Sequence, residues 1–309
     1  PYKSNGRMVH GLREAPANAA CVLPAPANAA CVLPAPANAS CAEYCTMFAM
    51  TLNHRVLSTL PACERVLLLV AMEAEGRTLI SELGLQRDET GFDARLPFEH
   101  YRGRAMGMDL LLTLSGKDAR HGVDNIGTEP AALSAYISAS KFAPHVCINA
   151  GTAGGFLARG GMIGDVYLSE GVFRFHDRRV SIPGFQAAGV GNFDALDVRE
   201  LAQELGFKVG SVSTGSSLDL SDADSRAMES FGAHAKEMEA AAIAWVLSHL
   251  GVPFFAIKGI TDLVDGPHPS HEEFLRHLAF ASKRVHDAVL AVLGALAQRN
   301  SLPGDAHAS

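Results

Sequence analysis

The sequence has no apolar run of the length that a membrane-spanning helix needs, and it has no excess of basic residues. A membrane helix takes about 20 consecutive apolar residues, and every apolar run in this 309-residue chain is shorter. Lysine and arginine total 26 against 33 aspartate and glutamate residues, a net charge of −7, so no positive field attracts nucleic acid phosphates. We therefore expect a soluble cytoplasmic protein with neither nucleic acid nor membrane as a partner.

Cysteine is also scarce, and its spacing does not suit a metal site. No Cys-x-x-Cys pair and no cysteine–histidine cluster has the spacing of zinc ligands. Three of the six cysteines belong to an N-terminal repeat rather than to a disulfide or metal-binding framework. We expect no metal, no other cofactor and a reducing intracellular environment. The six cysteines are Cys21, Cys31, Cys41, Cys45, Cys63 and Cys147.

The N-terminal repeat lacks the apolar pattern from which a core could be built. The unit APANAACVLP occupies residues 15–24 and 25–34, and a partial third copy ends at Cys41. Because proline recurs at every tenth position, a long helix cannot form there. We predict a disordered extension over residues 1–62, one folded domain over residues 63–299 and a tail over residues 300–309. Plastid targeting by the extension is an alternative to the cytoplasm, since acidic residues are sparse in it.

Strands and helices alternate after residue 64, which is typical of an α/β fold. Residues 65–72, RVLLLVAM, are apolar without alternation, as expected of a strand buried on both faces. We predict a single three-layer domain with a central mixed β-sheet flanked by helices. Ser270 and Glu273 are expected to form a capping box at the start of the last helix. The other predicted elements are strands at residues 145–152 (running into a glycine-rich turn), 165–172, 208–215 and 253–262, a hairpin at 100–115 turning at Arg102-Gly103, and helices at 128–141, 240–250 and 270–297.

Acidic residues stand where three of these strands end or a helix begins. They are Glu73 and Glu75, Glu237 and Glu239, and Asp262. In open α/β sheets, ligands bind outside the carboxyl ends of the strands, and converging carboxylates there suit acid–base chemistry. The alternative for each residue alone is a helix cap or a favourable contact with the helix dipole.

Four motifs, in chain order, resemble those of the nucleoside phosphorylase/nucleosidase superfamily. They are AMEAE at residues 71–75, INAGTAGGF at 148–156, KEMEAAAIA at 236–244 and IKGITDLVDG at 257–266. Segments beginning at Gly116, Phe175 and Ser213 are similar to the plant branch, the 5′-methylthioadenosine nucleosidases, which are related to bacterial methylthioadenosine/S-adenosylhomocysteine nucleosidases. The resemblance implies a nucleoside phosphorylase-like fold and a homodimer. It also implies hydrolysis of 5′-methylthioadenosine to adenine and 5-methylthioribose in methionine salvage, with weaker or no activity on S-adenosylhomocysteine.

The resemblance assigns the reaction to three carboxyl groups. Asp262 matches the acid that protonates N7 of adenine, which is a poor leaving group as an anion. An ordinary aspartate is ionised at neutral pH, so burial or neighbouring carboxylates must raise its pKa. Glu75 matches the residue that positions and deprotonates the attacking water. Glu239 matches the acceptor of the 2′- and 3′-hydroxyls, where its charge stabilises the ribosyl cation.

Three further matched residues are expected beside the water and the acid. Thr152, within a glycine-rich segment that allows close approach of the backbone, is expected to help hold the water. Lys258 stands where bacterial members carry an arginine near the water, and a solvated surface lysine is its alternative. Thr261 is expected to hold the carboxyl group of Asp262 or to contact the base.

Four more matched residues are expected against the ribose and the adenine. Met238 is expected to pack beneath the ribose, with core packing as its alternative, and Met72 to line the ribose or methylthio pocket through its soft thioether. Leu218 is expected to cover the adenine in place of the aromatic ring of the bacterial enzymes. Asp219 is expected to read the edge of the base through its backbone.

Three other functions compete with a nucleosidase. A phosphorylase would need a basic anion cradle near the ribose, where the carboxylate of Glu75 has the wrong sign of charge. A storage protein of the same fold could lose the catalytic carboxylates, all of which are present here. A nucleoside-binding regulator is the third alternative. Release of adenine from the nucleoside would distinguish an enzyme from such a regulator.

Overall fold

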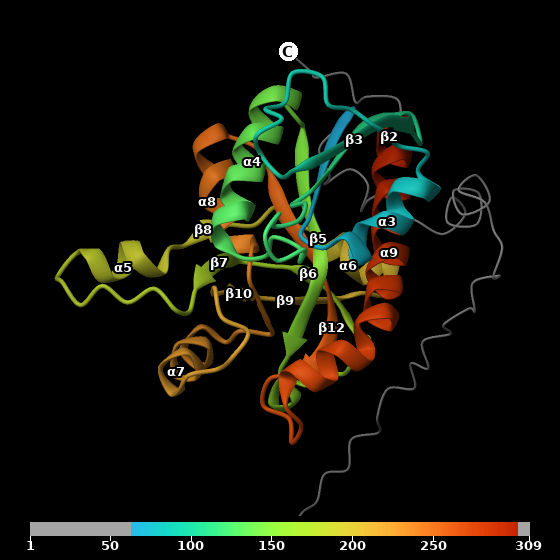
Figure 1. The fold of residues 1–309 in the computed structure, drawn as a ribbon. Helices are drawn as coiled ribbons and strands as arrows, with labels where there is room; N and C mark the ends of the chain where they lie inside the picture. The colour runs from blue at the N-terminus through green and yellow to red at the C-terminus, as the bar shows by residue number, and fades with distance from the viewer. Residues whose placement is uncertain (1–62, 302–309) are drawn as a thin grey trace, which may run out of the picture. The chain divides into compact units, whose positions relative to one another are not determined.

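The computed structural model describes residues 63–301 of the chain. The described part begins with β1 (Arg65–Val70) and ends with α9 (Ser270–Ser301), which Figure 1 shows in blue and red. The predicted extension over residues 1–62 lies outside the described residues, as does most of the predicted tail. Two hydrogen bonds between Cys63 and Asn300 join the start of the described part to the end of α9.

The described strands form one sheet that branches at β5 (Val146–Gly155). β5 pairs in parallel with β1 over residues 146–149 on one side and with β12 (Phe254–Leu263) over residues 147–155 on the other. At its carboxyl end, Gly154 and Gly155 also pair with the antiparallel strand β11 (Ala235–Glu237). The sheet therefore opens at the end of β5 into two branches, one leading through β11 and one through β12.

The two branches account for the twelve strands of this sheet. The first runs in the order β2 (Gln86–Arg87), β3 (Glu99–Ala105), β4 (Met108–Leu114), β1, β5, β11, β10 (Val212–Thr214), β7 (Val172–Phe175) and β8 (Phe193–Asp194). The second runs from β5 through β12 to β6 (Val166–Ser169) and β9 (Lys208–Gly210). Parallel and antiparallel pairs occur in both, which confirms the predicted mixed sheet.

Helices cover both faces of the sheet, so the domain has three layers (Figure 1). One face carries α3 (Glu73–Glu82), α6 (Arg199–Leu205) and α9, and the other carries α4 (Thr128–Phe142) and α8 (Ala240–Leu250). The remaining helices are η1 (Leu157–Arg159), α5 (Phe185–Val190) and α7 (Asp222–Phe231). None of the helices between residues 63 and 301 is long and apolar enough to cross a membrane.

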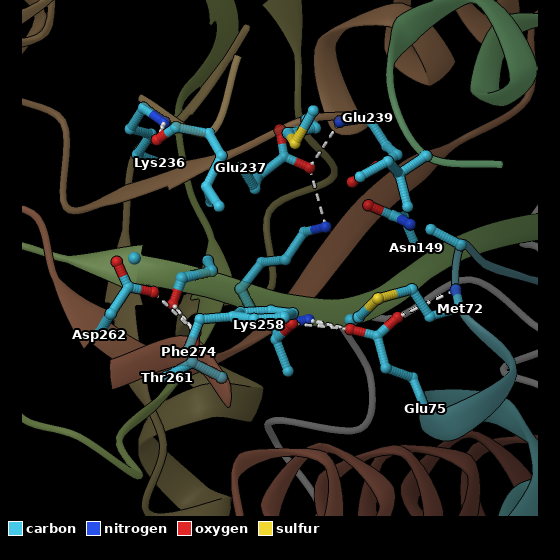
Figure 2. A pocket seen from close by; sticks show the side chains of 18 of the residues that line it. Met72, Glu75, Asn149, Lys236, Glu237, Glu239, Lys258, Thr261, Asp262 and Phe274 are labelled. Atoms are coloured by element: carbon cyan, nitrogen blue, oxygen red, sulfur yellow. Dashed lines mark hydrogen bonds and ion pairs between the residues drawn. The ribbon is translucent and has the colours of Figure 1, made fainter. Parts of the chain in front are cut away.

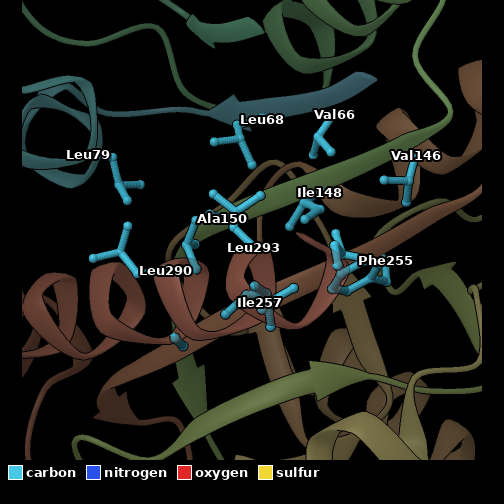
Figure 3. Close-up of a cluster of buried hydrophobic side chains, with 14 of the residues drawn as sticks. Val66, Leu68, Leu79, Val146, Ile148, Ala150, Phe255, Ile257, Leu290 and Leu293 are labelled. Carbon is cyan, nitrogen blue, oxygen red and sulfur yellow. The ribbon is translucent and has the colours of Figure 1, made fainter. Parts of the chain in front are cut away.

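The apolar run in β1 supplies both cores, as its lack of alternation predicted. Figure 3 shows Leu68 in a cluster with Leu79 of α3 and Leu290 of α9. Its neighbours Leu67 and Leu69 point to the other face, into the core beneath α4 and α8. The predicted strands at residues 145–152 and 253–262 and the helices at 128–141, 240–250 and 270–297 are likewise confirmed, with small shifts at their ends.

The predicted turn of the hairpin at Arg102-Gly103 is wrong. Both residues lie inside β3, and the turn is at Met106-Gly107, between the paired residues Ala105 and Met108. Met106 and Gly107 both have positive φ, 51° and 77°, as a two-residue turn that matches the twist of its strands requires. Methionine gives no sign of this conformation in the sequence.

The predicted glycine-rich turn after residue 152 is also wrong, because β5 continues through Gly155. Its glycines make room for side chains rather than for a turn. A Cβ atom on Gly154 would lie 2.9 Å from Oδ2 of Asp262, and one on Gly155 would lie 2.9 Å from Cγ2 of Ile260. The strands predicted at residues 165–172 and 208–215 are each divided in two, near Gly171 and Ser211.

The predicted capping box at the start of α9 is not formed either. Ser270 is already the first residue of the helix, and its side chain hydrogen-bonds the carboxyl group of Asp262. The carboxylate of Glu273 accepts a hydrogen bond from the backbone N–H of Leu263 at 2.9 Å. Both side chains thus tie the start of α9 to the end of β12 instead of capping the helix.

β12 approaches α9 so closely that only glycine fits at one position, and this gives a prediction. A Cβ atom on Gly259 would lie 2.6 Å from Cγ2 of Val285 and 3.0 Å from the backbone oxygen of Ala281. We expect Gly259→Ala to lower the free energy of unfolding by about 1–3 kcal/mol through overpacking, measured by urea denaturation.

Gly294 in the same helix is the matched control, because nothing lies within 4 Å of the position of its Cβ. Gly294→Ala should leave stability unchanged or raise it by about 0.5–1 kcal/mol, as alanine does in a helix interior. Equal effects of the two substitutions would contradict the close approach of β12 and α9.

Candidate active site

A cavity of about 160 Å³ lies where β11 and β12 separate from the end of β5. This is the switch point at which ligands bind in open α/β sheets. Figure 2 shows its side chains converging from β5, β11, β12 and the start of α3. Its lining residues are Ala71, Met72, Glu75, Ile126, Asn149, Ala150, Gly151, Thr152, Ala153, Gly154, Leu218, Lys236, Glu237, Met238, Glu239, Lys258, Thr261, Asp262 and Phe274.

Glu75 enters the cavity from the first turn of α3. Its Oε2 accepts the backbone N–H of Met72, the residue that precedes the helix, at 3.2 Å. Its Oε1 accepts the backbone N–H of Thr152 at 2.7 Å and the hydroxyl of Thr152 at 2.8 Å. Burial raises the pKa of Glu75, and these hydrogen bonds and the charge of Lys258 oppose that rise. Glu75 therefore caps the helix, which was the alternative interpretation from the sequence, and its carboxylate is also fixed in the cavity.

Asp262 is directed into the cavity by an irregularity in β12. The pairing with β5 shifts register between Ile260 and Asp262, as at a β-bulge, and bulges re-aim side chains. Thr261 and Asp262 thus both line the cavity, although neighbouring strand residues normally face opposite sides. The hydroxyl of Thr261 donates to Oδ1 of Asp262 at 2.8 Å. Burial raises the pKa of Asp262, against the hydrogen bonds from Thr261 and Ser270.

Lys258 forms a buried ion pair at the centre of the cavity wall. Its Nζ lies 2.8 Å from Oε2 of Glu237, and both side chains are only 1% exposed. Burial alone would lower the pKa of Lys258, but the carboxylates of Glu237 and Glu239 outweigh burial and raise it. The same pairing lowers the pKa of Glu237 against its own burial. The alternative of a solvated surface lysine is wrong.

Glu237 also holds the start of α8. Its carboxylate accepts the backbone N–H groups of Glu239 at 3.0 Å and of Ala240 at 2.9 Å, and it accepts the hydroxyl of Thr214. The hydroxyl of Thr214 in turn accepts the N–H of Ala241 at 2.9 Å. Charge on Glu237 is therefore balanced by Lys258, by a hydroxyl and by the free N–H groups of a helix terminus.

Glu239 precedes α8 and presents its carboxyl group to the cavity. Burial and then repulsion from Glu237 raise its pKa to about 7, while Lys258 and the N–H of Gly127, 3.0 Å from Oε1, oppose that rise. Its ionised form therefore predominates only above that pH. Lys258 thus lowers the free-energy cost of holding the carboxyl groups of Glu75, Glu237 and Glu239 close together.

Lys236 anchors the loop after β10 to the cavity. Its Nζ donates to the backbone oxygens of Ser217 and Leu218, each at 2.8 Å. Leu218 lines the cavity although it is 41% exposed. Asp219 is exposed and does not line the cavity, whereas every other residue in the predicted set does.

Several lining residues were not predicted. Asn149, Lys236 and Phe274 carry side chains toward the cavity (Figure 2), as does Glu237, which was expected only as one of the acidic residues near strand ends. Asn149 and Lys236 lie inside the recognised motifs, so position in the motif was the only available signal. Phe274 lies in α9, outside every recognised motif. Between residues 63 and 301, no group of three or more His, Cys, Asp or Glu side chains could hold a metal ion.

Comparison with known proteins shows the family of the chain. A sequence model of the phosphorylase superfamily matches residues 65–294. Two Arabidopsis thaliana proteins are each 38% identical to the chain: a 5′-methylthioadenosine/S-adenosylhomocysteine nucleosidase, with coverage of 74% of this chain and 90% of the relative, and a 5′-methylthioadenosine nucleosidase, with 76% and 88%. The chain belongs to the methylthioadenosine nucleosidases of the phosphorylase superfamily. The family that the motifs predicted is thereby confirmed.

Solved structures of the family have the same fold. The apo form of an Arabidopsis thaliana 5′-methylthioadenosine nucleosidase superposes with a TM-score of 0.72 at 37% identity, covering 75% of this chain and 96% of that one. The Neisseria meningitidis 5′-methylthioadenosine/S-adenosylhomocysteine nucleosidase in complex with methylthio-immucillin-A gives 0.62 at 25% identity, with 77% and 100% covered. The predicted nucleoside phosphorylase-like fold is confirmed.

The buried ion pair gives a prediction about stability. Lys258→Met leaves Glu237 without its cation in a buried site, and we expect the free energy of unfolding at pH 7 to fall by about 3–5 kcal/mol. The loss should shrink as the pH falls, because pairing lowers the pKa of Glu237 and its contribution disappears when the carboxylate is protonated. Urea denaturation at several pH values measures both effects.

Two controls separate this effect from loss of an ordinary charge. The double variant Lys258→Met/Glu237→Gln removes both charges but keeps an acceptor for the N–H groups at the start of α8, and it should recover most of the lost stability. Lys283→Met removes a solvent-exposed partner of Asp287 in α9 and should change stability by less than about 1 kcal/mol. A similarly small effect of Lys258→Met would show that the ion pair is not needed to hold the cluster.

Proposed function

We propose that this chain hydrolyses the N-glycosidic bond of 5′-methylthioadenosine, releasing adenine and 5-methylthioribose for methionine salvage. The observation that carries the proposal is that Glu75, Glu239 and Asp262, from three separate elements, line one cavity. The related proteins are nucleosidases by name, and one solved relative binds a methylthio-substituted inhibitor. A sample incubated with methylthioadenosine should release adenine without added phosphate, and failure to do so would reject the proposal.

Asp262 is the proposed acid of this reaction. Breaking the bond moves an electron pair onto the adenine, and protonation at N7 lets the base leave as a neutral molecule. The raised pKa of Asp262 favours the protonated form that can donate. The hydroxyls of Thr261 and Ser270 hold the carboxyl group in place. Leu218, on the loop held by Lys236, is proposed to cover the base. Asp219 follows Leu218 on this loop, and its backbone is proposed to contact the edge of the base.

Glu75 and Glu239 are proposed to act on the other side of the broken bond. Glu75 accepts a proton from water as the water oxygen bonds to the anomeric carbon, with Thr152 and Lys258 beside it. Glu239 accepts hydrogen bonds from the ribose hydroxyls, with Met238 beneath the ring. Its charge stabilises the positive charge that develops on the ribosyl group. The pKa of about 7 makes ribose binding improve as the pH rises through neutrality.

The charge of the cavity favours water over phosphate as the nucleophile. Its two lysines, Lys236 and Lys258, are engaged by backbone oxygens and by Glu237. Glu75 and Glu239 are the groups that remain directed at the ribose side, and carboxylates repel an incoming phosphate. We therefore propose hydrolysis rather than phosphorolysis for this chain.

We further propose that the chain acts as a homodimer in the cytoplasm. Ile126 lines the cavity but is 47% exposed, and further exposed apolar residues lie before α4 and along its first nine residues: Val123, Leu133 and Tyr136. A second copy over this face would bury these side chains and close the cavity. Sedimentation of the full chain should give twice its mass of 32.6 kDa, and a mass equal to one chain would reject the dimer.

The acid gives the first functional prediction. Asp262→Asn keeps the shape of the side chain but removes the proton donor, and general acid catalysis is worth about 10²–10⁴ in rate. We expect kcat to fall by that factor with little change in KM, because the ribose contacts through Glu239 remain. Steady-state kinetics of adenine release measures both constants.

The control variant for Asp262 is Glu239→Gln, which should raise KM as well as lower kcat, because it weakens binding of the ribose and stabilisation of its cation. A substrate with CH in place of N7 cannot be protonated there and should bind without being cleaved. Near-normal kcat in Asp262→Asn, or ready cleavage of that analogue, would rule out the proposed acid.

The second functional prediction concerns the 5′ substituent. Met72, Ile126 and Phe274 give the cavity an apolar wall, which suits a methylthio group and offers no partner to the charged homocysteine tail of S-adenosylhomocysteine. We expect kcat/KM for methylthioadenosine to be about tenfold higher or more, or roughly 1.4 kcal/mol. Competition between the two substrates in one assay measures the ratio, and equal efficiency would place the chain with the dual-specificity enzymes.

A further inference from the structure

Asn149 carries a buried hydrogen-bond acceptor that faces the cavity. The residue is 2% exposed and lies on β5. Its side-chain N–H₂ group donates to the backbone oxygen of Leu69, its neighbour in β1, at 3.0 Å. That bond fixes which end of the amide is the oxygen. Among residues 63–301, no donor lies within hydrogen-bonding distance of Oδ1. A buried acceptor without a donor is unfavourable, so we expect a ligand in the cavity to donate a hydrogen bond to this oxygen.

The neighbours of Asn149 indicate which ligand that is. Gly151 lies two residues further along β5 and therefore on the same face, about 6.6 Å away. The ideal Cβ position on Gly151 is 3.3 Å from Oε1 of Glu75. Lys258 pairs with Gly151 across β5 and β12, and Figure 2 shows its side chain rising toward Glu237, with Glu75 and Asn149 both on one side of it. The carboxylate, the ammonium and the free amide oxygen therefore border the same part of the cavity.

We propose that Oδ1 of Asn149 accepts a hydrogen bond from one O–H group of the water that attacks the anomeric carbon, while Glu75 accepts a hydrogen bond from the other O–H group. This rests on the proposed hydrolysis. The O–H proton passes to Glu75 as the water oxygen bonds to the anomeric carbon. The electron pair of the broken glycosidic bond goes to adenine, which receives a proton from Asp262. With both hydrogens held, a lone pair of the water is directed at the ribose.

Methanol tests this assignment, because it has one O–H where water has two. In the wild type, the methyl group of methanol would have to face Oδ1 of Asn149, so methanol should compete poorly. Asn149→Ala removes the acceptor and opens space for the methyl group. We expect kcat for hydrolysis to fall about tenfold. We also expect the ratio of O-methyl 5-methylthioriboside to 5-methylthioribose, measured by mass spectrometry in aqueous methanol, to rise at least tenfold.

The product ratio is measured within one reaction, so partial unfolding of a variant does not affect it. Asn149→Asp keeps an oxygen acceptor in the same place and should retain the low ratio of the wild type. Asn192→Ala is the matched control outside the cavity, since Asn192 contacts Arg174 beside α5, and it should change neither kcat nor the ratio. An unchanged ratio in Asn149→Ala, with the wild type active, would overturn the assignment and leave the proposed function standing.

The 2′-hydroxyl of the ribose is the other donor that could meet this oxygen. If it did, the effect of Asn149→Ala on kcat/KM would vanish with a 2′-deoxy substrate, and that result would overturn the proposal. Contact with the water predicts the same fold loss for both substrates. Absence of adenine release by the wild type would instead reject the nucleosidase function itself.

Discussion

The arrangement of the active site depends on one buried positive charge. Lys258 is paired with Glu237 at 2.8 Å and lowers the energy of ionised Glu75 and Glu239 as well. Without a cation, the buried carboxylates of Glu75, Glu237 and Glu239 would repel one another and take up protons. With it, Glu237 stays ionised and holds the start of α8, while the pKa of Glu239 stops near 7. The ion pair therefore influences both the position and the charge of Glu239, the proposed ribose-binding group.

The branching of the sheet provides the space that these groups fill. β5 pairs with β12 along its length and with β11 at its end, so the two strands that carry Glu237 and Asp262 separate around a cavity. Glycine residues in β5, the strand to which both β11 and β12 pair, leave room for the carboxyl groups. A side chain at Gly154 would collide with Asp262, whose Oδ2 lies 2.9 Å from the ideal Cβ position, and one at Gly151 would crowd Glu75, whose Oε1 lies 3.3 Å from it. The glycine-rich segment is part of the strand β5 and not a loop, and its glycines lie against the two carboxyl groups.

The electrostatics of the cavity suit a transition state that is positively charged. Burial raises the pKa of Asp262 on the base side, and Lys258 limits the corresponding rise of Glu75 on the water side. In the proposed reaction, a proton leaves one end of the cavity and another enters at the other end as the bond breaks. The carboxylate of Glu239 is proposed to stabilise the ribosyl cation, and the negative charge of the cavity disfavours phosphate. These properties come from contacts between distant segments: the pocket needs α3, β5, β11 and β12 in place together.

The sequence alone determined the family, the mixed three-layer α/β class and the carboxylates Glu75, Glu239 and Asp262, because local motifs bound to strand ends carry them. It could not place the hairpin turn, because the positive φ of Met106 is imposed by strand pairing, nor could it show that glycines continue β5. Only the tertiary structure decided the surroundings of the two cavity lysines and of Asn149. Whether a lysine is solvated or paired, and whether an amide oxygen meets a donor, depends on burial by residues far away in the chain.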